Sequence, residues 1–231
     1  MYIAIEGVIG VGKTTLARLL HESFQSNLLM EVFEENPFLS QFYADRQRYA
    51  FQTQMFFLLS RYHQQRRSVP ELTSGGQNLC SDYTFEKDAL FARINIVGDE
   101  LDMYNRVHEA LAEKIINPDL IVYLRAETPI LMQRIAQRDR SYERNMQYAY
   151  IDELNQAYDD FFLKGSRSAP VLSIEAGQMD FVRYEKDLRW IENRIREALL
   201  DAPYQPELPL SDSGENSQAP NFQLKGHTPT V

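Results

Sequence analysis

Cysteine is almost absent from the sequence: Cys80 is the only one in 231 residues. A single cysteine excludes an intrachain disulfide and a zinc site built from several cysteines, and its apolar setting favours a packing role. No apolar run approaches the roughly 20 residues that a membrane-spanning helix needs. The chain opens on a strand pattern without a basic-then-apolar leader, so we expect a cytoplasmic protein without a membrane partner.

Positive charge is also scarce, because 24 Lys and Arg residues stand against 33 Asp and Glu and give a formal net charge of −9. Binding along a nucleic-acid backbone needs many phosphate-neutralising cations, so this balance argues against a nucleic-acid partner. A local basic cluster can still bind a small phosphate ligand. Hydrophobic residues make up 44% of the chain, which is enough for one domain with a sizeable core.

Apolar periodicity is missing from residues 201–231, where five of the ten prolines lie among Ser, Asn and Gln. Such a composition buries too little apolar surface to offset the entropy of folding. We therefore predict one folded domain over residues 1–200, followed by a disordered tail over residues 201–231.

The clearest motif follows an apolar strand predicted over residues 2–6, where the chain carries the full G-x-x-x-x-G-K-[ST] pattern. Its glycines let backbone N–H groups turn around phosphate oxygens, and a helix predicted to reach about Phe24 adds its positive end. Lys13 would contact the β- and γ-phosphates, and Thr14 would hold Mg²⁺. A glycine turn can serve packing alone, but packing does not require Lys-Thr after the last glycine. The predicted phosphate site comprises Gly7, Val8, Ile9, Gly10, Val11, Gly12, Lys13, Thr14 and Thr15.

Strands and helices alternate along the rest of the chain. Further strands are predicted over residues 28–33, 78–82, 119–124 and 171–175. Longer helices are predicted over residues 46–67, 99–116, 148–163 and 181–200, with shorter ones at 36–43, around 86–93 and from Thr128. The last helix should pack through Trp190, Ile191 and Ile195. This alternation predicts an α/β fold with a doubly wound, five-stranded parallel sheet and helices on both faces.

Acidic residues lie at the ends of two predicted strands, at the sheet edge where such folds bind ligands. Glu31, Glu34 and Glu35 crowd the end of the second strand, although a solvated loop is the favoured interpretation for Glu35. Asp82 ends the third strand, where it would support Mg²⁺ or hold a catalytic neighbour; it could also only cap the next helix. These acids should share one cleft with the phosphate loop.

Polar side chains also interrupt two helices. Gln54 and Arg61 lie seven residues apart, near one face of helix 46–67, and need partners: each other, the backbone, or a planar ligand. Arg134 and Arg138 share a helix face, and Arg140 follows closely. Such a run is commonly a solvated surface, but beside a phosphate loop it favours an arginine lid over a transferring phosphoryl group.

Taken together, these motifs resemble the deoxynucleoside kinase family, and in particular its short bacterial deoxyadenosine/deoxyguanosine kinase branch. The resemblance covers about residues 1–200. It rests on the phosphate loop, on E-V-F-E-E-N-P at residues 31–37, on F-Y at 42–43 with Y-A-F-Q-T-Q at 49–54, and on residues 134–143. It implies a P-loop kinase fold with an arginine-rich lid, ATP as phosphate donor, Mg²⁺, a small deoxynucleoside acceptor, a role in nucleotide salvage, and a homodimer.

The same resemblance implies a role for each candidate residue. Glu31 would accept the proton of the 5′-hydroxyl, with Glu34 as the alternative base. Arg134, Arg138 and Arg140 would form the lid. The implied substrate contacts are Tyr43 and Glu143 at the sugar 3′-hydroxyl, and Gln54, Arg61 and Asp88 at the base.

One segment departs from the family pattern, which commonly has an acid followed by Arg and Ser after the third strand. This chain has Asp82-Tyr83-Thr84. Tyr83 would stand at the substrate in place of the arginine, and a tyrosine can donate one hydrogen bond but carries no positive charge. Arg93, further along the next helix, is the alternative source of that charge.

The sequence thus predicts a kinase that phosphorylates the 5′-hydroxyl of a deoxynucleoside. A purine is favoured only by the resemblance to the bacterial branch, because Gln54, Arg61 and Asp88 also suit cytosine. No Asn-Lys-x-Asp segment for guanine recognition by a GTPase occurs. Two alternatives stay open: a thymidylate-kinase-like enzyme acting on a nucleoside monophosphate, and a nucleotide-binding protein without catalysis.

Overall fold

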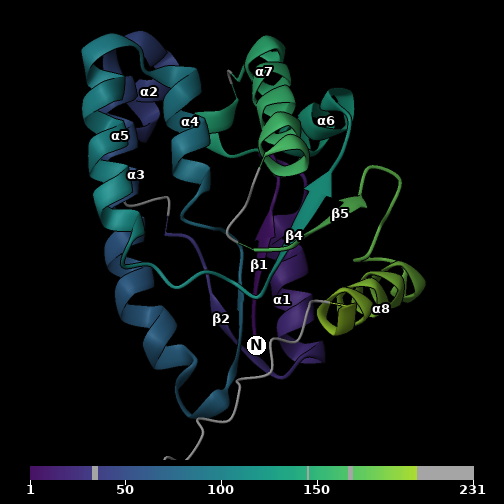
Figure 1. The fold of residues 1–231 in the computed structure, drawn as a ribbon. Helices are drawn as coiled ribbons and strands as arrows, with labels where there is room; N and C mark the ends of the chain where they lie inside the picture. The colour runs from purple at the N-terminus through teal and green to yellow at the C-terminus, as the bar shows by residue number, and fades with distance from the viewer. Residues whose placement is uncertain (33–35, 145, 166–168, 202–231) are drawn as a thin grey trace, which may run out of the picture.

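The five strands form one parallel sheet, as predicted, and their order in it is β2-β3-β1-β4-β5 (Figure 1). The computed structural model describes residues 1–32, 36–144, 146–165 and 169–201. The strands are β1 Tyr2–Glu6, β2 Ser26–Leu29, β3 Asn78–Ser81, β4 Leu120–Arg125 and β5 Val171–Glu175.

The helices cover both faces of this sheet. They are α1 Lys13–Ser23, α2 Leu39–Ala44, α3 Arg46–Leu72, α4 Lys87–Asn95, α5 Gly98–Ala112, α6 Thr128–Arg138, α7 Tyr148–Asp159 and α8 Glu185–Asp201. The crossover from β1 to β2 runs along the sheet in the opposite direction to the later crossovers, so right-handed connections place α1 on one face and α3, α4 and α7 on the other. α8 lies beside α1, where Ser23 contacts Glu192.

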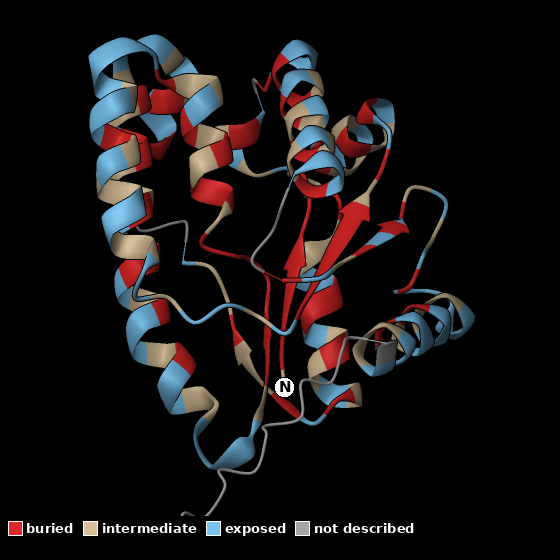
Figure 2. Cartoon of the chain, viewed as in Figure 1, coloured by how far each residue is buried: buried red, intermediate tan, exposed pale blue. Residues whose placement is uncertain are grey.

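The core lies on both sides of the central strands. All five residues of β1 and the first five of β4 are buried, which Figure 2 shows as continuous red strands. A parallel strand covered by helices on both faces reads as an uninterrupted apolar run, and this is why the sequence revealed both strands. Glu6 is the charged exception in β1 and is fully buried.

The second strand lies earlier than predicted, over residues 26–29 instead of 28–33. The pairing of β2 with β3 ends at Asp82, which bonds to the backbone after β2 in two ways. The Asp82 N–H donates to the Leu29 carbonyl (3.3 Å), and the Asp82 carboxylate accepts from the Glu31 N–H (2.7 Å). Glu31 therefore follows the strand in a loop. Glu34 and Glu35 lie outside the described residues.

Tertiary packing also moved several helix boundaries. α3 continues to Leu72 through Pro70, beyond the predicted end at residue 67, because Val69 is buried beside the second core cluster that includes Tyr2 and Leu79. α5 ends at Ala112, before the predicted residue 116. The start of α6 was predicted correctly: it begins at Thr128, whose hydroxyl donates to Asp152 (2.8 Å).

The last helix starts at Glu185, four residues later than predicted, because Asp180 forms a turn with the backbone N–H groups of Arg183 and Tyr184. Its packing residues were predicted in part. Ile191 and Ile195 are buried, whereas Trp190 is 46% exposed and the expectation that it packs in the core was wrong. α8 ends at Asp201; residues 202–231 of the predicted tail lie outside the described residues, and the domain boundary stays a prediction.

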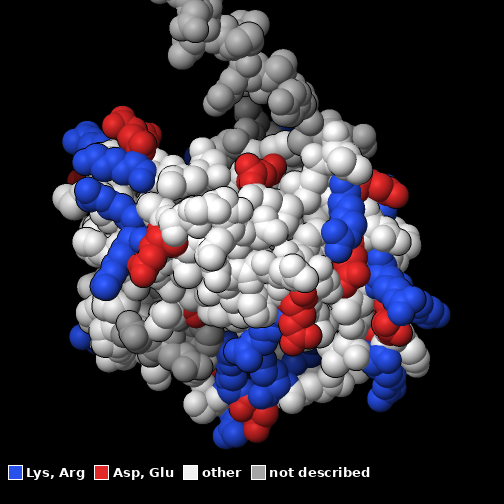
Figure 3. Space-filling view, turned by 90° about the horizontal axis from the view of Figure 1, so that it is seen from below, with Lys and Arg blue, Asp and Glu red and all other residues white. Residues whose placement is uncertain are grey.

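Charge on the surface is mixed. On the face seen in Figure 3, the described Lys and Arg side chains stand in small groups beside Asp and Glu, around a broad area without charged side chains. Within the described ranges, no helix combines the length and the apolar character that crossing a bilayer requires.

Candidate active site

A cavity of about 570 Å³ opens at the carboxyl ends of the strands and brings together residues far apart in the sequence. It is bounded by the phosphate loop, the Glu31 loop, α3, the start of α4 and the segment after α6. Among the predicted site residues, those that line it are Ile9, Gly10, Val11, Gly12, Lys13, Thr14, Thr15, Glu31, Tyr43, Gln54, Arg61, Asp82, Arg134, Arg138, Arg140 and Glu143. Gly7, Val8, Tyr83, Asp88 and Arg93 are not among the lining residues.

The phosphate loop has the backbone that its glycines permit. Gly7, Gly10 and Gly12 have φ values of 144°, 89° and 110°, in the region that side chains rarely adopt. A Cβ atom on Gly10 would also lie 2.9 Å from the Leu131 carbonyl, so the loop can pass close to α6 only with glycine there. The Lys13 ammonium donates to the carbonyls of Gly7 (2.7 Å) and Val8 (3.2 Å). Desolvation, reinforced by the nearby charge of Lys87, lowers the pKa of Lys13 to about 8.

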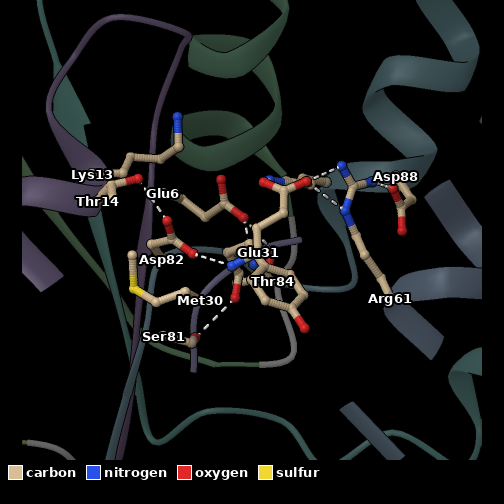
Figure 4. Close-up of polar contacts among 12 residues, drawn as sticks. Glu6, Lys13, Thr14, Met30, Glu31, Arg61, Ser81, Asp82, Thr84 and Asp88 are labelled. Carbon is tan, nitrogen blue, oxygen red and sulfur yellow. Dashed lines mark hydrogen bonds and ion pairs between the residues drawn. The ribbon is translucent and has the colours of Figure 1, made fainter. Parts of the chain in front are cut away.

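Asp82 connects the phosphate loop to the Glu31 loop. One carboxylate oxygen accepts the Thr14 hydroxyl at 2.6 Å, and the other accepts the Glu31 backbone N–H at 2.7 Å (Figure 4). A threonine hydroxyl and a buried carboxylate are the hard oxygen ligands that suit Mg²⁺, which in kinases binds few carboxylates together with substrate phosphates. The described residues contain no cluster of three or more His, Cys, Asp or Glu side chains that could hold a metal. Thr14 and Asp82 therefore fit a phosphate-bound Mg²⁺ better than a protein-only metal cage.

Glu31 is held by two cations. The Arg61 Nε donates to Oε1 at 2.9 Å, with a second, closer bond from Nη2, and the Lys87 ammonium donates to Oε2 at 2.6 Å. Burial opposes the ionisation of Glu31, but the charges of Arg61 and Lys87 outweigh it and hold the Glu31 pKa far below its ordinary value. Glu31 is thus a fixed carboxylate anion at neutral pH.

Lys87 and Glu6 belong to this centre although the sequence pointed to neither. Lys87 is only 3% exposed and lines the cavity. Glu6 accepts from the Thr84 N–H (2.6 Å) and hydroxyl (2.8 Å), and burial raises its pKa. The available signals were weak: an acid directly before Gly7, and a lysine four residues after Tyr83.

Tyr83 and Arg93 do not supply charge to the cavity. Tyr83 is fully buried, and its hydroxyl donates to Gln64 Oε1 at 2.6 Å. The Gln64 amide in turn donates to the Met30 carbonyl at 2.8 Å, so Tyr83 braces the backbone next to Glu31. Arg93 is exposed on α4. The cation nearest to the role expected at these positions is Lys87, whose ammonium lies 5.5 Å from the centre of the Tyr83 ring.

The far end of the cavity is aromatic and amide-lined. Tyr43 and Tyr142 stack at 6.2 Å with an interplanar angle of 11°, and the Arg61 guanidinium lies 4.6 Å from the centre of the Phe57 ring. Gln54 is 2% exposed and lines the cavity, and its side chain forms no hydrogen bond with any other described residue. A planar ligand with donors and acceptors would satisfy its amide.

Arg61 is not partnered by Gln54 but by acids. It forms an ion pair with Asp88, which is fully buried behind it, as well as with Glu31 (Figure 4). Asp88 therefore acts on the cavity only through Arg61.

The three predicted lid arginines have different partners. Arg138 binds both carboxylate oxygens of Glu143 (2.7 and 2.6 Å), and Arg140 lies 3.7 Å from Glu143. Arg134 instead donates to the carbonyls of Val11 (3.1 Å) and Ala176 (3.0 Å). It thus ties the phosphate loop to the segment after β5, whose residues 179–182 also line the cavity. The sequence pointed to none of these four as site residues, and it predicted 181 and 182 only as the start of a helix.

Comparison with known proteins gives concordant results. The model of the deoxynucleoside kinase family matches residues 3–200. Bacillus subtilis deoxyguanosine kinase is 32% identical over 202 residues, spanning 86% of this chain and 98% of that enzyme. Dictyostelium discoideum deoxyadenosine kinase is 33% identical over 178 residues, covering 75% of this chain and 71% of that one.

Solved structures of deoxyadenosine kinase are similar to this chain in fold. Deoxyadenosine kinase from M. mycoides, with the products dCMP and dCDP bound, superposes with a TM-score of 0.75 at 25% identity, covering 85% of this chain and all of that one. The same enzyme with dATP bound gives a TM-score of 0.73.

Proposed function

The chain belongs to the deoxynucleoside kinase family, and we propose that it transfers the γ-phosphoryl group of ATP to the 5′-hydroxyl of a purine deoxynucleoside, giving the 5′-monophosphate. The observation that carries this proposal is one cavity in which a phosphate loop, a fixed carboxylate and an aromatic, amide-lined end meet. The phosphate loop suits the phosphate donor, and the fixed carboxylate suits the attacking hydroxyl. The aromatic, amide-lined end suits the sugar and base of the acceptor.

Glu31 is the proposed base. A carboxylate offers about four lone-pair sites, of which Arg61 and Lys87 occupy three, so it can also accept the hydrogen bond of a 5′-hydroxyl. In phosphoryl transfer, positioning and charge stabilisation dominate, and a carboxylate kept ionised orients the hydroxyl and receives its proton as the bond to phosphorus forms. Thr14 and Asp82 would hold Mg²⁺, which when bound neutralises phosphate charge.

The other site residues follow from their places in the cavity. Arg138 and Arg140, now paired with Glu143, would contact the transferring phosphoryl group, while Arg134 holds the loop that faces the donor nucleotide. Tyr43 and Glu143 would bind the sugar, and Gln54 would form paired hydrogen bonds with the base. Arg61, backed by Asp88, would complete base selection.

Support for a purine comes from the relatives that act on deoxyguanosine or deoxyadenosine. A further relative from Bacillus subtilis, 25% identical, is a deoxyadenosine/deoxycytidine kinase, so deoxycytidine is the strongest competitor. Nucleotide salvage and a homodimer, expected from the resemblance, belong to the same proposal.

An acceptor screen tests it. With ATP and Mg²⁺, deoxyguanosine and deoxyadenosine should give 5′-monophosphates faster than deoxycytidine, thymidine or any deoxynucleoside monophosphate. Glu31→Gln should lower kcat at least about 100-fold while leaving ATP affinity unchanged, since general-base catalysis contributes about that much. The matched control is Glu71→Gln, an exposed position on α3. Preference for dTMP, or ATP binding without transfer to any acceptor, would sink the proposal.

A further inference from the structure

We propose that Lys87 is a positioning residue for the transfer step: it fixes the Glu31 carboxylate against the attacking 5′-hydroxyl and places a positive charge on the phosphate side of that carboxylate. This inference rests on the function proposed above. It adds a residue that no sequence motif pointed to.

The first observation is how the two cations divide Glu31 between them. Arg61 donates two hydrogen bonds to Oε1 of Glu31, and the Lys87 ammonium donates one to Oε2 at 2.6 Å. With each oxygen held by its own cation, the carboxylate cannot rotate without breaking a charge-assisted bond. Loss of Lys87 would leave Oε2 without this restraint.

The second observation is the side on which each cation stands. Arg61 faces the base end of the cavity, since it contacts Phe57 and pairs with Asp88. Lys87 lies on the other side, where its charge acts on Lys13 of the phosphate loop and on Glu6. Of the two cations that pair with Glu31, Lys87 is therefore the one on the side of the phosphate loop.

The third observation is that helix stability does not explain a lysine here. Lys87 is the first residue of α4, where the positive end of the helix dipole disfavours a cation, and it is only 3% exposed, which lysine rarely tolerates. An ammonium has three donors, and among the described residues Glu31 accepts the single hydrogen bond that Lys87 forms.

The other groups around Glu31 come from several elements. They are Arg61 on α3, Lys13 after β1, Asp82 and Tyr83 after β3, and Tyr158 on α7. Lys87 and Arg61 are the two that ion-pair with it directly. Loss of Lys87 therefore leaves Arg61 as the single direct ion-pair partner of Glu31 among the described residues.

The experiment compares Lys87→Met and Lys87→Arg with the wild type, using ATP and the best acceptor from the screen. Lys87→Met should lower kcat at least tenfold, with a smaller change in KM for ATP. Lys87→Arg should restore most of kcat. Lys114→Met, an exposed lysine, is the matched control. An unchanged kcat in folded Lys87→Met, or a loss of kcat that Lys87→Arg does not restore, would overturn the inference.

A second variant covers the case in which Lys87→Met does not fold. Glu31→Gln/Lys87→Met removes both charges together, so no buried ion is left alone. If Lys87 acts through Glu31, this double variant should have a kcat within about threefold of Glu31→Gln alone. A further tenfold loss would contradict action through Glu31.

Failure of this inference can be told apart from failure of the proposed function. If the wild type phosphorylates deoxynucleosides but the variants do not behave as expected, only the role of Lys87 is refuted. If the wild type has no such activity, the proposed function itself is refuted.

Discussion

The guanidinium of Arg61 forms an ion pair with Asp88, a carboxylate with no solvent exposure. Removing one partner of a buried pair leaves the other as an uncompensated charge. We expect Arg61→Met to lower the free energy of unfolding by about 3–5 kcal/mol, measured by urea denaturation at pH 7. Arg61→Met/Asp88→Asn should recover most of this loss, and an equal loss in both variants would show that Asp88 does not depend on Arg61.

Lys13 should take up a proton when ATP binds at alkaline pH. Desolvation and Lys87 lower the Lys13 pKa to about 8, so at pH 8.5 most Lys13 side chains are neutral in the free protein. The triphosphate favours the charged form and raises this pKa again, which predicts net proton uptake by Lys13 when ATP binds at pH 8.5.

Calorimetry in buffers of different ionisation enthalpy measures this uptake. Lys13→Arg is the control, because its guanidinium stays protonated and should bind ATP without uptake. Equal uptake by both proteins would assign the proton to another group.

Asp82 should determine how much Mg²⁺ the enzyme needs. Its carboxylate accepts the Thr14 hydroxyl, so Asp82→Asn removes a charge and reorients a second proposed ligand. We expect the Mg²⁺ concentration for half-maximal activity to rise about 10- to 100-fold at fixed ATP. Asp102→Asn, on the exposed side of α5, should leave the Mg²⁺ dependence unchanged. An unaltered Mg²⁺ requirement in Asp82→Asn would remove Asp82 from the metal site.

Tyr83→Phe should affect stability more than catalysis. The substitution deletes one hydroxyl that donates to Gln64 and does not line the cavity. The free energy of unfolding should fall by about 1 kcal/mol, the usual net value of such a hydrogen bond, and kcat should stay within about threefold of wild type. A tenfold loss of kcat at unchanged stability would place the Tyr83 hydroxyl in the transfer step.

Local patterns explain the parts of the site that the sequence could predict. The phosphate loop is contiguous, and its glycines and Lys13 do their work within nine residues. β1 and β4 were visible because burial on both faces leaves an apolar run in the sequence. Strand carboxyl ends then bring Glu31 and Asp82 to the loop in any parallel sheet of this kind.

Other parts of the site depended on which partners meet in space. Arg61 could have paired with Gln54 or with a ligand, but its partners are carboxylates 30 and 27 residues away. Glu31 lies in a loop and not at the end of β2, because its backbone N–H donates to Asp82, the residue that follows β3. The sequence pattern of α8 does not tell whether Trp190 lies in the core or at the surface. The way α8 packs on the domain buries Ile191 and Ile195 and leaves Trp190 exposed.

The sequence by itself determined the phosphate loop, the parallel sheet and the set of acids at its edge, because these depend on short-range spacing and on burial that leaves a periodic trace. Only the tertiary structure decided which cations pair with Glu31, namely Arg61 and Lys87. Tyr83 turns towards Gln64, Arg93 faces solvent, and Lys87 reaches the carboxylate. Electrostatic partnership depends on distance and desolvation in three dimensions, and neither quantity can be obtained from the order of residues along a helix.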